Sequence, residues 1–351
     1  MSHPARLLAL AATLALGTSA PALAAGVPHP AAASSLSAGG SPLAVLGYMP
    51  EWPGSGANQA FMAHPGDVTA IAPLWFTVSA SGTIAALGRQ NEAQLVAFAH
   101  RHHDRVLAMF TNAGGNDAIL WNPLRDRVAT AIRNIVLADH LDGVNIDFES
   151  LGPRDRTPLT LFVEAVRNRL GPLGRLTTVA VGPKTSTGAQ GNPQGDAYNY
   201  QQLGAIASQV VIMTYDNHTP GSAPGPVAPM PWVRRCLGYA LRRIPRKKIL
   251  LGIADYGYQW NRQDQGPSLP AAQAEHVAAA QGVAIRWSTW ADEPHFSFTG
   301  SGGSERVWFE DGQSMAFKIA LAKADGLGGV ALWALGGQDP AAWGALAFAR
   351  R

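Results

Sequence analysis

The sequence of 351 residues has very little cysteine: Cys236 is the only one. A single cysteine excludes an intramolecular disulfide, so the core has to stabilise the fold. Charge is also scarce, since only 15% of the residues are charged and the net charge is +3. The densest basic run, residues 242–248, is typical of a helix C-terminus with its solvated loop. It does not resemble a nucleic-acid module, so we expect no nucleic-acid partner.

The N-terminal apolar run is short. It covers residues 7–16, fewer than the roughly 20 that a membrane-spanning helix needs, which argues against a transmembrane anchor. It follows Arg6 and precedes Ala22-Leu23-Ala24, a small-x-small cleavage pattern. We therefore predict a secretory signal over residues 1–24 and a secreted, periplasmic or cell-envelope location. Residues 25–42, rich in Ala, Gly, Ser and Pro, indicate a flexible leader, and we expect a monomeric folded part over residues 43–351 without a membrane span.

The whole sequence is 47% hydrophobic, and from residue 43 onward it alternates between two patterns. Short apolar runs rich in Val, Ile, Leu and aromatic residues are separated by segments with helical spacing, as in βα units around a parallel sheet. The eight predicted strands cover residues 43–49, 68–78, 105–111, 143–149, 176–181, 209–214, 249–255 and 329–334. Eight such units favour an α/β fold of the closed (β/α)₈ TIM barrel type over a doubly wound open sheet, although periodicity alone leaves both open.

Amphipathic segments lie between several of the predicted strands. Helices are predicted over residues 91–100, 158–170, 232–241 and 313–324, and Asp339-Pro340 is a plausible start for a last helix. About fifty residues separate Tyr258 from Trp308, too many for a simple loop. This stretch contains a predicted helix over 270–281 and β-like pieces over 284–290 and 295–299. We therefore expect a small α+β insertion, at approximately residues 259–306, between strands seven and eight.

The most informative segment is residues 142–149, with the sequence DGVNIDFE. Because strand side chains alternate, the apolar residues at 144, 146 and 148 face one side and Asn145, Asp147 and Glu149 face the other. Three polar side chains inside a barrel are costly to desolvate unless they bond to each other or to a ligand. The pattern therefore favours a functional site, and the alternative is a strand end paired with a buried Arg or Lys.

Glu149 is expected at the C-terminal rim, where barrel enzymes hold their active sites. Asp147 precedes it by two residues on the same face, close enough to share a hydrogen bond. An ionised Asp147 would raise the pKa of Glu149 by like-charge repulsion. A glutamic acid kept protonated in this way suits a general acid.

The segment resembles the DxxDxDxE signature of glycoside hydrolase family 18, with Asn145 in place of the middle aspartate. Matching motifs fall at other predicted strand ends: Gly47-Tyr48, Met213-Thr214-Tyr215-Asp216, Tyr256-Gly257-Tyr258 and Leu332-Trp333. The resemblance covers nearly the whole mature chain. Residues 307–311, VWFED, and the Asn variant further resemble the branch with spore cortex-lytic and peptidoglycan-directed members.

The resemblance implies a retaining, substrate-assisted glycosidase without a cofactor. Glu149 would protonate the glycosidic oxygen while the substrate's 2-acetamido oxygen attacks the anomeric carbon. Asp147 would orient the acetamido group, and the Tyr215 hydroxyl would bind its oxygen. The implied partner is a polysaccharide that contains N-acetylglucosamine, either chitin or peptidoglycan, cleaved at β-1,4 bonds.

The resemblance also implies a substrate-binding set. Met213 and Asp216 would line the subsite and Trp333 would form its floor, whereas Tyr48, Trp52 and Tyr256 are open between binding and packing. Asn145 cannot take a proton as an aspartate does, so the pH profile should depend mainly on Asp147 and Glu149.

Other interpretations remain open. The chain could be a binding protein of the same fold without catalysis. A metal site near His218 lacks a second ligand at suitable spacing, so none is expected. His100, His102 and His103 end a predicted helix and fit surface positions better than ligand positions. The loop over residues 219–231 is rich in Gly and Pro and follows the sixth strand, where it could shape the cleft.

Overall fold

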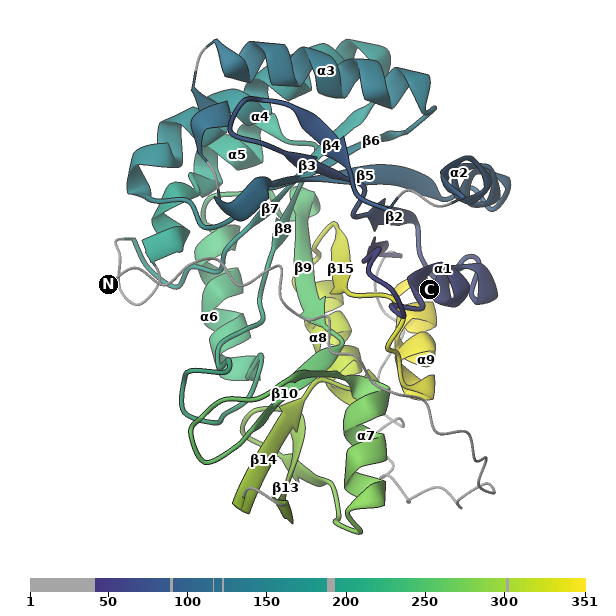
Figure 1. Cartoon of the computed structure of the whole chain (residues 1–351), viewed down its shortest axis with the longest axis vertical. Helices are drawn as coiled ribbons and strands as arrows, with labels where there is room; N and C mark the ends of the chain where they lie inside the picture. The colour runs from purple at the N-terminus through teal and green to yellow at the C-terminus, as the bar shows by residue number, and fades with distance from the viewer. Residues whose placement is uncertain (1–41, 89–90, 116, 122, 188–192, 301–302) are drawn as a thin grey trace.

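The computed structural model describes residues 42–351 except 89–90, 116, 122, 188–192 and 301–302; the expected signal and nearly all of the leader lie outside this range (Figure 1). Within the described residues, parallel strands close into a barrel. In order around it these are β1 (Ala44–Met49), β2 (Ala70–Pro73) with β3 (Phe76–Val78), β5 (Arg105–Asn112), β6 (Gly143–Asp147), β7 (Leu176–Val181), β8 (Gln209–Ile212), β9 (Ile249–Ala254) and β15 (Gly329–Trp333). Pairing of β1 with both β15 and β2, and of β2 with β5, closes the ring. The predicted eight-stranded TIM barrel is confirmed, and an open sheet is excluded.

The second barrel position differs from the expectation. A single strand was predicted over residues 68–78, but the chain forms β2 and β3 with Leu74 and Trp75 between them. The break follows Pro73, whose ring nitrogen cannot donate a ladder hydrogen bond. β3 then pairs with β5 and also forms an antiparallel hairpin with β4 (Ile84–Ala86).

Helices cover the outside of the barrel (Figure 1). They are α1 (Ala57–Ala63), α2 (Glu92–Arg101), α3 (Leu124–Ala138), α4 (Arg156–Leu170), α5 (Tyr200–Ile206), α6 (Met230–Leu241), α8 (Gly312–Ala324) and α9 (Pro340–Ala349). The four helices predicted between strands are present, and α9 begins as predicted because the Asp339 side chain accepts hydrogen bonds from the N–H groups of Ala341 and Ala342. Among the described residues, no helix is both long enough and apolar enough to cross a bilayer.

Strand alternation divides the core into two parts. Val144, Ile146 and Phe148 of the β6 segment belong to the large cluster between strands and helices. Residues of the opposite face fill the barrel interior, among them Tyr48 and Met109. Gly143 starts β6 against β7 so closely that a Cβ there would lie 2.2 Å from the carbonyl oxygen of Leu176. The polar face of β6 therefore points into the barrel, as the sequence predicted.

The part of the chain between β9 and β15 in sequence forms a separate antiparallel sheet, which lies at the lower end of the view in Figure 1. It consists of β10 (Tyr256–Trp260), β11 (Ser268–Pro270), β12 (Arg286–Ser288), β13 (Glu293–Gly300) and β14 (Gly303–Phe309), in the order β11-β10-β14-β13-β12. α7 (Ala271–Ala280) packs on it around a small apolar core that includes Phe296 and Phe309. The inserted sheet covers more of the sequence than the expected residues 259–306. Tyr256 already pairs with Pro270, and Phe309 still pairs with Gly257.

Candidate active site

Asp147 and Glu149 meet at the C-terminal end of β6. Their side chains share a hydrogen bond, while Phe148 between them packs outward. β6 itself ends at Asp147, so Glu149 lies just beyond the strand rather than inside it as predicted. Together with Tyr215, both carboxyl groups line a cavity of about 220 Å³. The two acids and the tyrosine that the sequence singled out therefore lie in one pocket.

Burial dominates the electrostatics of this pair. Desolvation raises the pKa of Asp147 to about 7, and the hydrogen bond with Glu149 works against that rise. The pKa of Glu149 is raised well above its usual range, first by burial and then by the charges of Asp147 and Asp216. The like-charge repulsion that the sequence suggested is present, but it is secondary to burial. Burial and the neighbouring charges therefore both favour the protonated form of Glu149.

The peptide at Glu149 is fixed by neighbouring side chains. The Asn112 side chain, at the end of β5, accepts a 2.8 Å hydrogen bond from the N–H of Glu149 and donates another of 2.8 Å to its carbonyl oxygen. The hydroxyl of buried Tyr198 donates to the carbonyl oxygen of Phe148 at 2.9 Å. These contacts fix the backbone position of Glu149, which lies beyond the last paired residue of β6.

Asn145 lies beneath the acid pair and is fully buried. Its Oδ1 accepts a hydrogen bond from the Tyr48 hydroxyl at 3.3 Å, and its Nδ2 donates to Thr178 Oγ1 at 2.9 Å. Thr178 in turn donates to the carbonyl oxygen of Val144 at 3.0 Å. Asn145 does not line the cavity among the described residues, so it supports the site from below.

Tyr215 and Asp216 follow β8 and enter the cavity from the side. Tyr215 is 8% exposed, and its ring packs edge-on against Tyr256 at 6.3 Å between centroids. Burial raises the pKa of the Tyr215 phenol well above its usual range, so it remains a hydrogen-bond donor. Asp216 has a left-handed backbone with φ of 62°, and its Oδ1 accepts hydrogen bonds from the hydroxyls of Tyr256 at 2.6 Å and Tyr258 at 2.8 Å.

The position of Tyr256 differs from the expectation. The sequence placed Tyr256-Gly257-Tyr258 at the end of the seventh barrel strand, but β9 ends at Ala254 and these residues begin β10 of the inserted sheet. The backbone turns between the strands at Asp255, whose N–H donates to the carbonyl oxygen of Trp333. Tyr256 still lines the cavity, because β10 starts at the barrel rim.

Trp333, at the end of β15, is the aromatic wall of the cavity. Its ring lies 5.4 Å from that of Tyr48 and 6.4 Å from that of Trp52, which is 49% exposed. Met213 also lines the cavity. A second cavity of about 350 Å³ shares Trp333 and Tyr256 with the first and is bounded by Trp52 and by residues of the inserted sheet. Both cavities open at the same end of the barrel.

Several residues at the site were not singled out from the sequence. Asn112, Thr178, Gly182, Pro183 and Tyr198 all contact or line it. A signal existed for Asn112, because this polar residue, followed by Ala113-Gly114-Gly115, comes directly after the third predicted strand. Tyr198 follows β7 by many residues, and no local pattern indicates where it lies.

The histidines lie in other surroundings. His218 Nδ1 is 3.0 Å from the carbonyl oxygen of Ala223, and His100 Nε2 is 2.9 Å from the Asp142 carboxylate. Within the described part of the chain, no three His, Cys, Asp or Glu side chains are grouped to hold a metal ion.

Comparisons with known proteins show which family this chain resembles. The cortical fragment-lytic enzyme of Bacillus anthracis is 35% identical over 206 residues, which cover 57% of this chain and 47% of that protein. The chain spans between about half and two thirds of the length of the first curated relatives. The crystal structure of a chitinase from Chromobacterium violaceum ATCC 12472 has a TM-score of 0.81 and 27% identity, covering 88% of this chain and 98% of that one.

The spore cortex-lytic enzyme SleL of Bacillus cereus also has a TM-score of 0.81 and 27% identity, covering 89% of this chain and 75% of its own. The sequence profile described as Glycosyl hydrolases family 18 matches residues 44–339, most of the chain. The protein therefore belongs to glycosyl hydrolases family 18.

Proposed function

We propose that the protein is an exported glycoside hydrolase that cleaves β-1,4 bonds after N-acetylglucosamine in chitin-like or peptidoglycan glycans, with retention of configuration. The observation that carries the proposal is the pairing of Asp147 with Glu149 in a cavity that Tyr215 also lines. Family membership supports glycosidase chemistry. The predicted signal at residues 1–24 supports export.

Glu149 acts as the general acid in this proposal. Its raised pKa keeps it protonated near neutral pH, and it lies at the cavity wall rather than in the apolar core. It donates its proton to the glycosidic oxygen as the bond to the anomeric carbon breaks. The resulting carboxylate later takes a proton from the water that completes hydrolysis.

The nucleophile comes from the substrate. The 2-acetamido oxygen attacks the anomeric carbon and forms an oxazolinium ion, which water opens from the same face as the departed group. Asp147 supports this step because its Oδ1 is buried and has no hydrogen-bond partner among the described residues, so an acetamido N–H would satisfy it. The Tyr215 hydroxyl donates to the acetamido oxygen and holds it in line.

The cavity walls suit a single sugar at the reacting position. Trp333 and Tyr48 supply aromatic surface, and Met213, Asp216 and Tyr256 complete the lining, a mixture of apolar faces and convergent polar groups that is typical of ligand sites. The adjoining cavity, which shares Trp333 and Tyr256, gives room for a second sugar of the same chain.

Turnover of a labelled N-acetylglucosamine oligomer tests the proposal, with Glu149→Gln as the key variant. We expect the wild type to release shorter oligomers, and Glu149→Gln to lose at least about a hundredfold in kcat while still binding the oligomer. Glu164→Gln, on the outer helix α4, is the matched control and should behave as the wild type. Digestion of chitin and of peptidoglycan, with the products identified by mass spectrometry, then separates the two substrates. A wild type that binds these glycans and cleaves none of them would instead be a binding protein of this fold.

A further inference from the structure

The loop that carries Tyr215 and Asp216, residues 213–229, is held by the inserted sheet. Hydroxyls of Tyr256 and Tyr258 on β10 bind Asp216. Further along, the indole N–H of Trp260 donates to the carbonyl oxygen of Thr219 at 3.3 Å, and the N–H of Met230 donates to the carbonyl oxygen of Ala291 at 2.9 Å. The insertion therefore contacts this loop along much of its length.

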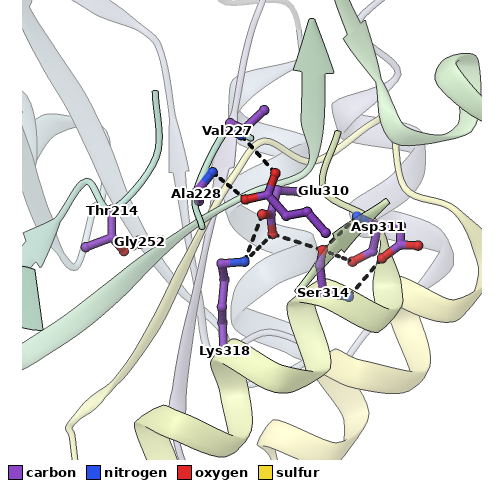
Figure 2. Close-up of polar contacts among 9 residues, drawn as sticks. Thr214, Val227, Ala228, Gly252, Glu310, Asp311, Ser314 and Lys318 are labelled. Carbon is purple, nitrogen blue, oxygen red and sulfur yellow. Dashed lines mark hydrogen bonds and ion pairs between the residues drawn. The ribbon is translucent and has the colours of Figure 1, made fainter. Parts of the chain in front are cut away.

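Glu293, the first residue of β13, makes the most unusual of these contacts. Its side chain is fully buried, and its two carboxylate oxygens accept hydrogen bonds from successive backbone N–H groups, Val227 at 2.8 Å and Ala228 at 2.6 Å. In Figure 2, Val227 and Ala228 lie beside the ion pair of Glu310 with Lys318. A single carboxylate thus fixes two adjacent peptides that lie 65 and 66 residues away in the sequence.

The carboxylate belongs to a buried charged group. Lys318 Nζ lies 2.8 and 2.7 Å from the two oxygens of Glu310, and the Ser314 hydroxyl donates to Glu310 at 2.9 Å (Figure 2). Glu293 also shares a side-chain hydrogen bond with Glu310, and burial raises the pKa of Glu293 well above its usual range. Buried charges cost several kcal/mol each to desolvate, and apolar residues of similar volume often serve stability equally well. The group is therefore better explained by the geometry it imposes than by stability.

A short route connects Glu293 with the cavity. The carbonyl oxygen of Val227 accepts a 2.8 Å hydrogen bond from the N–H of Asn217. Asn217 directly follows Asp216, whose left-handed backbone is an uncommon conformation for a residue with a side chain. Glu293 thus holds Val227, Val227 holds Asn217, and Asn217 restrains the turn that aims Asp216 and Tyr215 into the cavity.

We propose that Glu293 is a positioning residue for the reaction, acting on Asp216 and Tyr215 through the peptides of Val227 and Asn217. The inference rests on the proposed function, since it concerns how the acetamido-binding side of the cavity is held. Glu293 lines neither cavity in the described part of the chain, so it acts through the loop and not by contact with substrate.

A double-mutant cycle tests this route. Glu293→Gln keeps the size of the side chain but places an N–H₂ group against a backbone N–H, so one of the two bonds to the loop is lost. We expect kcat/KM on an N-acetylglucosamine oligomer to fall about tenfold, the upper end of the effect of one lost hydrogen bond. In the Asp216→Asn background, Glu293→Gln should lower kcat/KM less than about twofold, because Asp216, the residue that Glu293 positions, is already altered. Equal losses in both backgrounds would overturn the proposal.

Hydrogen exchange gives a readout that does not depend on activity. Glu293→Gln should speed amide exchange in peptides that contain Asn217, Val227 and Ala228, while peptides from β5 and β6 stay as in the wild type. Glu305→Gln is the matched control, because Glu305 lies on β14 of the same sheet and bonds to Gln259 instead of the loop. If Glu293→Gln does not fold, Glu293→Asp, which withdraws the carboxylate by one methylene, replaces it in both experiments.

The outcomes separate the two proposals. Unchanged exchange at residues 217–228 in the Glu293 variant, or an equal change in Glu305→Gln, overturns the positioning role. A wild type inactive on every N-acetylglucosamine glycan overturns the proposed function, and the exchange experiment then still decides whether Glu293 orders the loop.

Discussion

The Asn112 side-chain amide holds the backbone of Glu149 with two hydrogen bonds of 2.8 Å each: its oxygen accepts one from the Glu149 N–H, and its nitrogen donates the other to the Glu149 carbonyl oxygen. β6 ends two residues earlier, so strand pairing does not hold this peptide. The Asn112 side chain, at the end of β5, therefore takes the place of the strand-pairing hydrogen bonds that Glu149 lacks. The position of the proposed proton donor therefore depends on backbone hydrogen bonds from a side chain of a neighbouring strand.

Replacing Asn112 should allow the backbone of Glu149 to shift relative to the barrel strands. We expect Asn112→Ala to lose about 1–3 kcal/mol of stability, because two peptide groups lose their partners. We expect kcat to fall at least about tenfold, since small displacements of a catalytic group are costly. Thermal unfolding and steady-state kinetics on the labelled oligomer measure both effects. Asn168→Ala, on the surface of α4, is the control, and normal kcat in Asn112→Ala would contradict this role.

The raised pKa of Asp147, about 7, predicts how stability changes with pH. Below about pH 4 this carboxyl is protonated in both the folded and the unfolded chain, so it makes no difference. As the pH rises toward 7 the unfolded chain releases the proton first, and the folded state loses stability until the folded group also ionises. The loss by pH 8 is on the order of 4 kcal/mol, about 1.4 kcal/mol for each pH unit between the two pKa values.

Asp147→Asn removes this titration. The variant should therefore gain stability relative to the wild type as the pH rises from 4 to 8, while it loses turnover. Melting temperatures of both proteins measured across this range give the comparison. Two curves that run parallel would show that Asp147 titrates normally in the folded protein.

Asn145→Asp should change the pH dependence of activity. The new carboxyl would lie between Tyr48 and Thr178, beneath Asp147 and Glu149. An added negative charge raises the pKa of neighbouring acids, so we expect the alkaline limit of kcat to move upward by about half a pH unit or more. A pH–rate profile measures the shift. Identical limits in the two proteins would mean that the position is electrostatically separate from the acid pair.

Tyr215→Phe removes one hydroxyl from the cavity wall. The ring would still pack against Tyr256, so the fold and KM should change little. If the hydroxyl binds the acetamido oxygen as it attacks, kcat should fall about 100- to 1000-fold, the usual effect of losing one such donor. Steady-state kinetics separate the two constants, and Tyr239→Phe, buried against Tyr200 outside the cavity, is the control. A rise in KM alone would assign the hydroxyl to ground-state binding.

The β6 segment was predictable because its information is local. Alternation along a strand decides which residues share a face, and it can be read without knowing which strands lie beside it. The apolar residues pack outward, and the acidic ones line the cavity: Val144, Ile146 and Phe148 against Asp147 and Glu149. The same holds for α9, where Asp339 caps the helix it precedes. Pro73 gives a local signal for the break in the second strand that the prediction did not use, whereas the point where the chain leaves the barrel, Asp255, is fixed by a tertiary contact with Trp333.

The sequence by itself determined the repeating strand–helix pattern, the polar face of β6 and the residue types of the site, since these follow from periodicity and side-chain chemistry within short segments. Only the tertiary structure decided which distant residues hold them: Asn112 at the peptide of Glu149, Tyr198 beside it, and Glu293 under the loop of Asp216. Such contacts join residues that lie tens of positions apart. They form only when barrel closure and the inserted sheet bring donors and acceptors within about 3 Å, a distance that no spacing along the chain encodes.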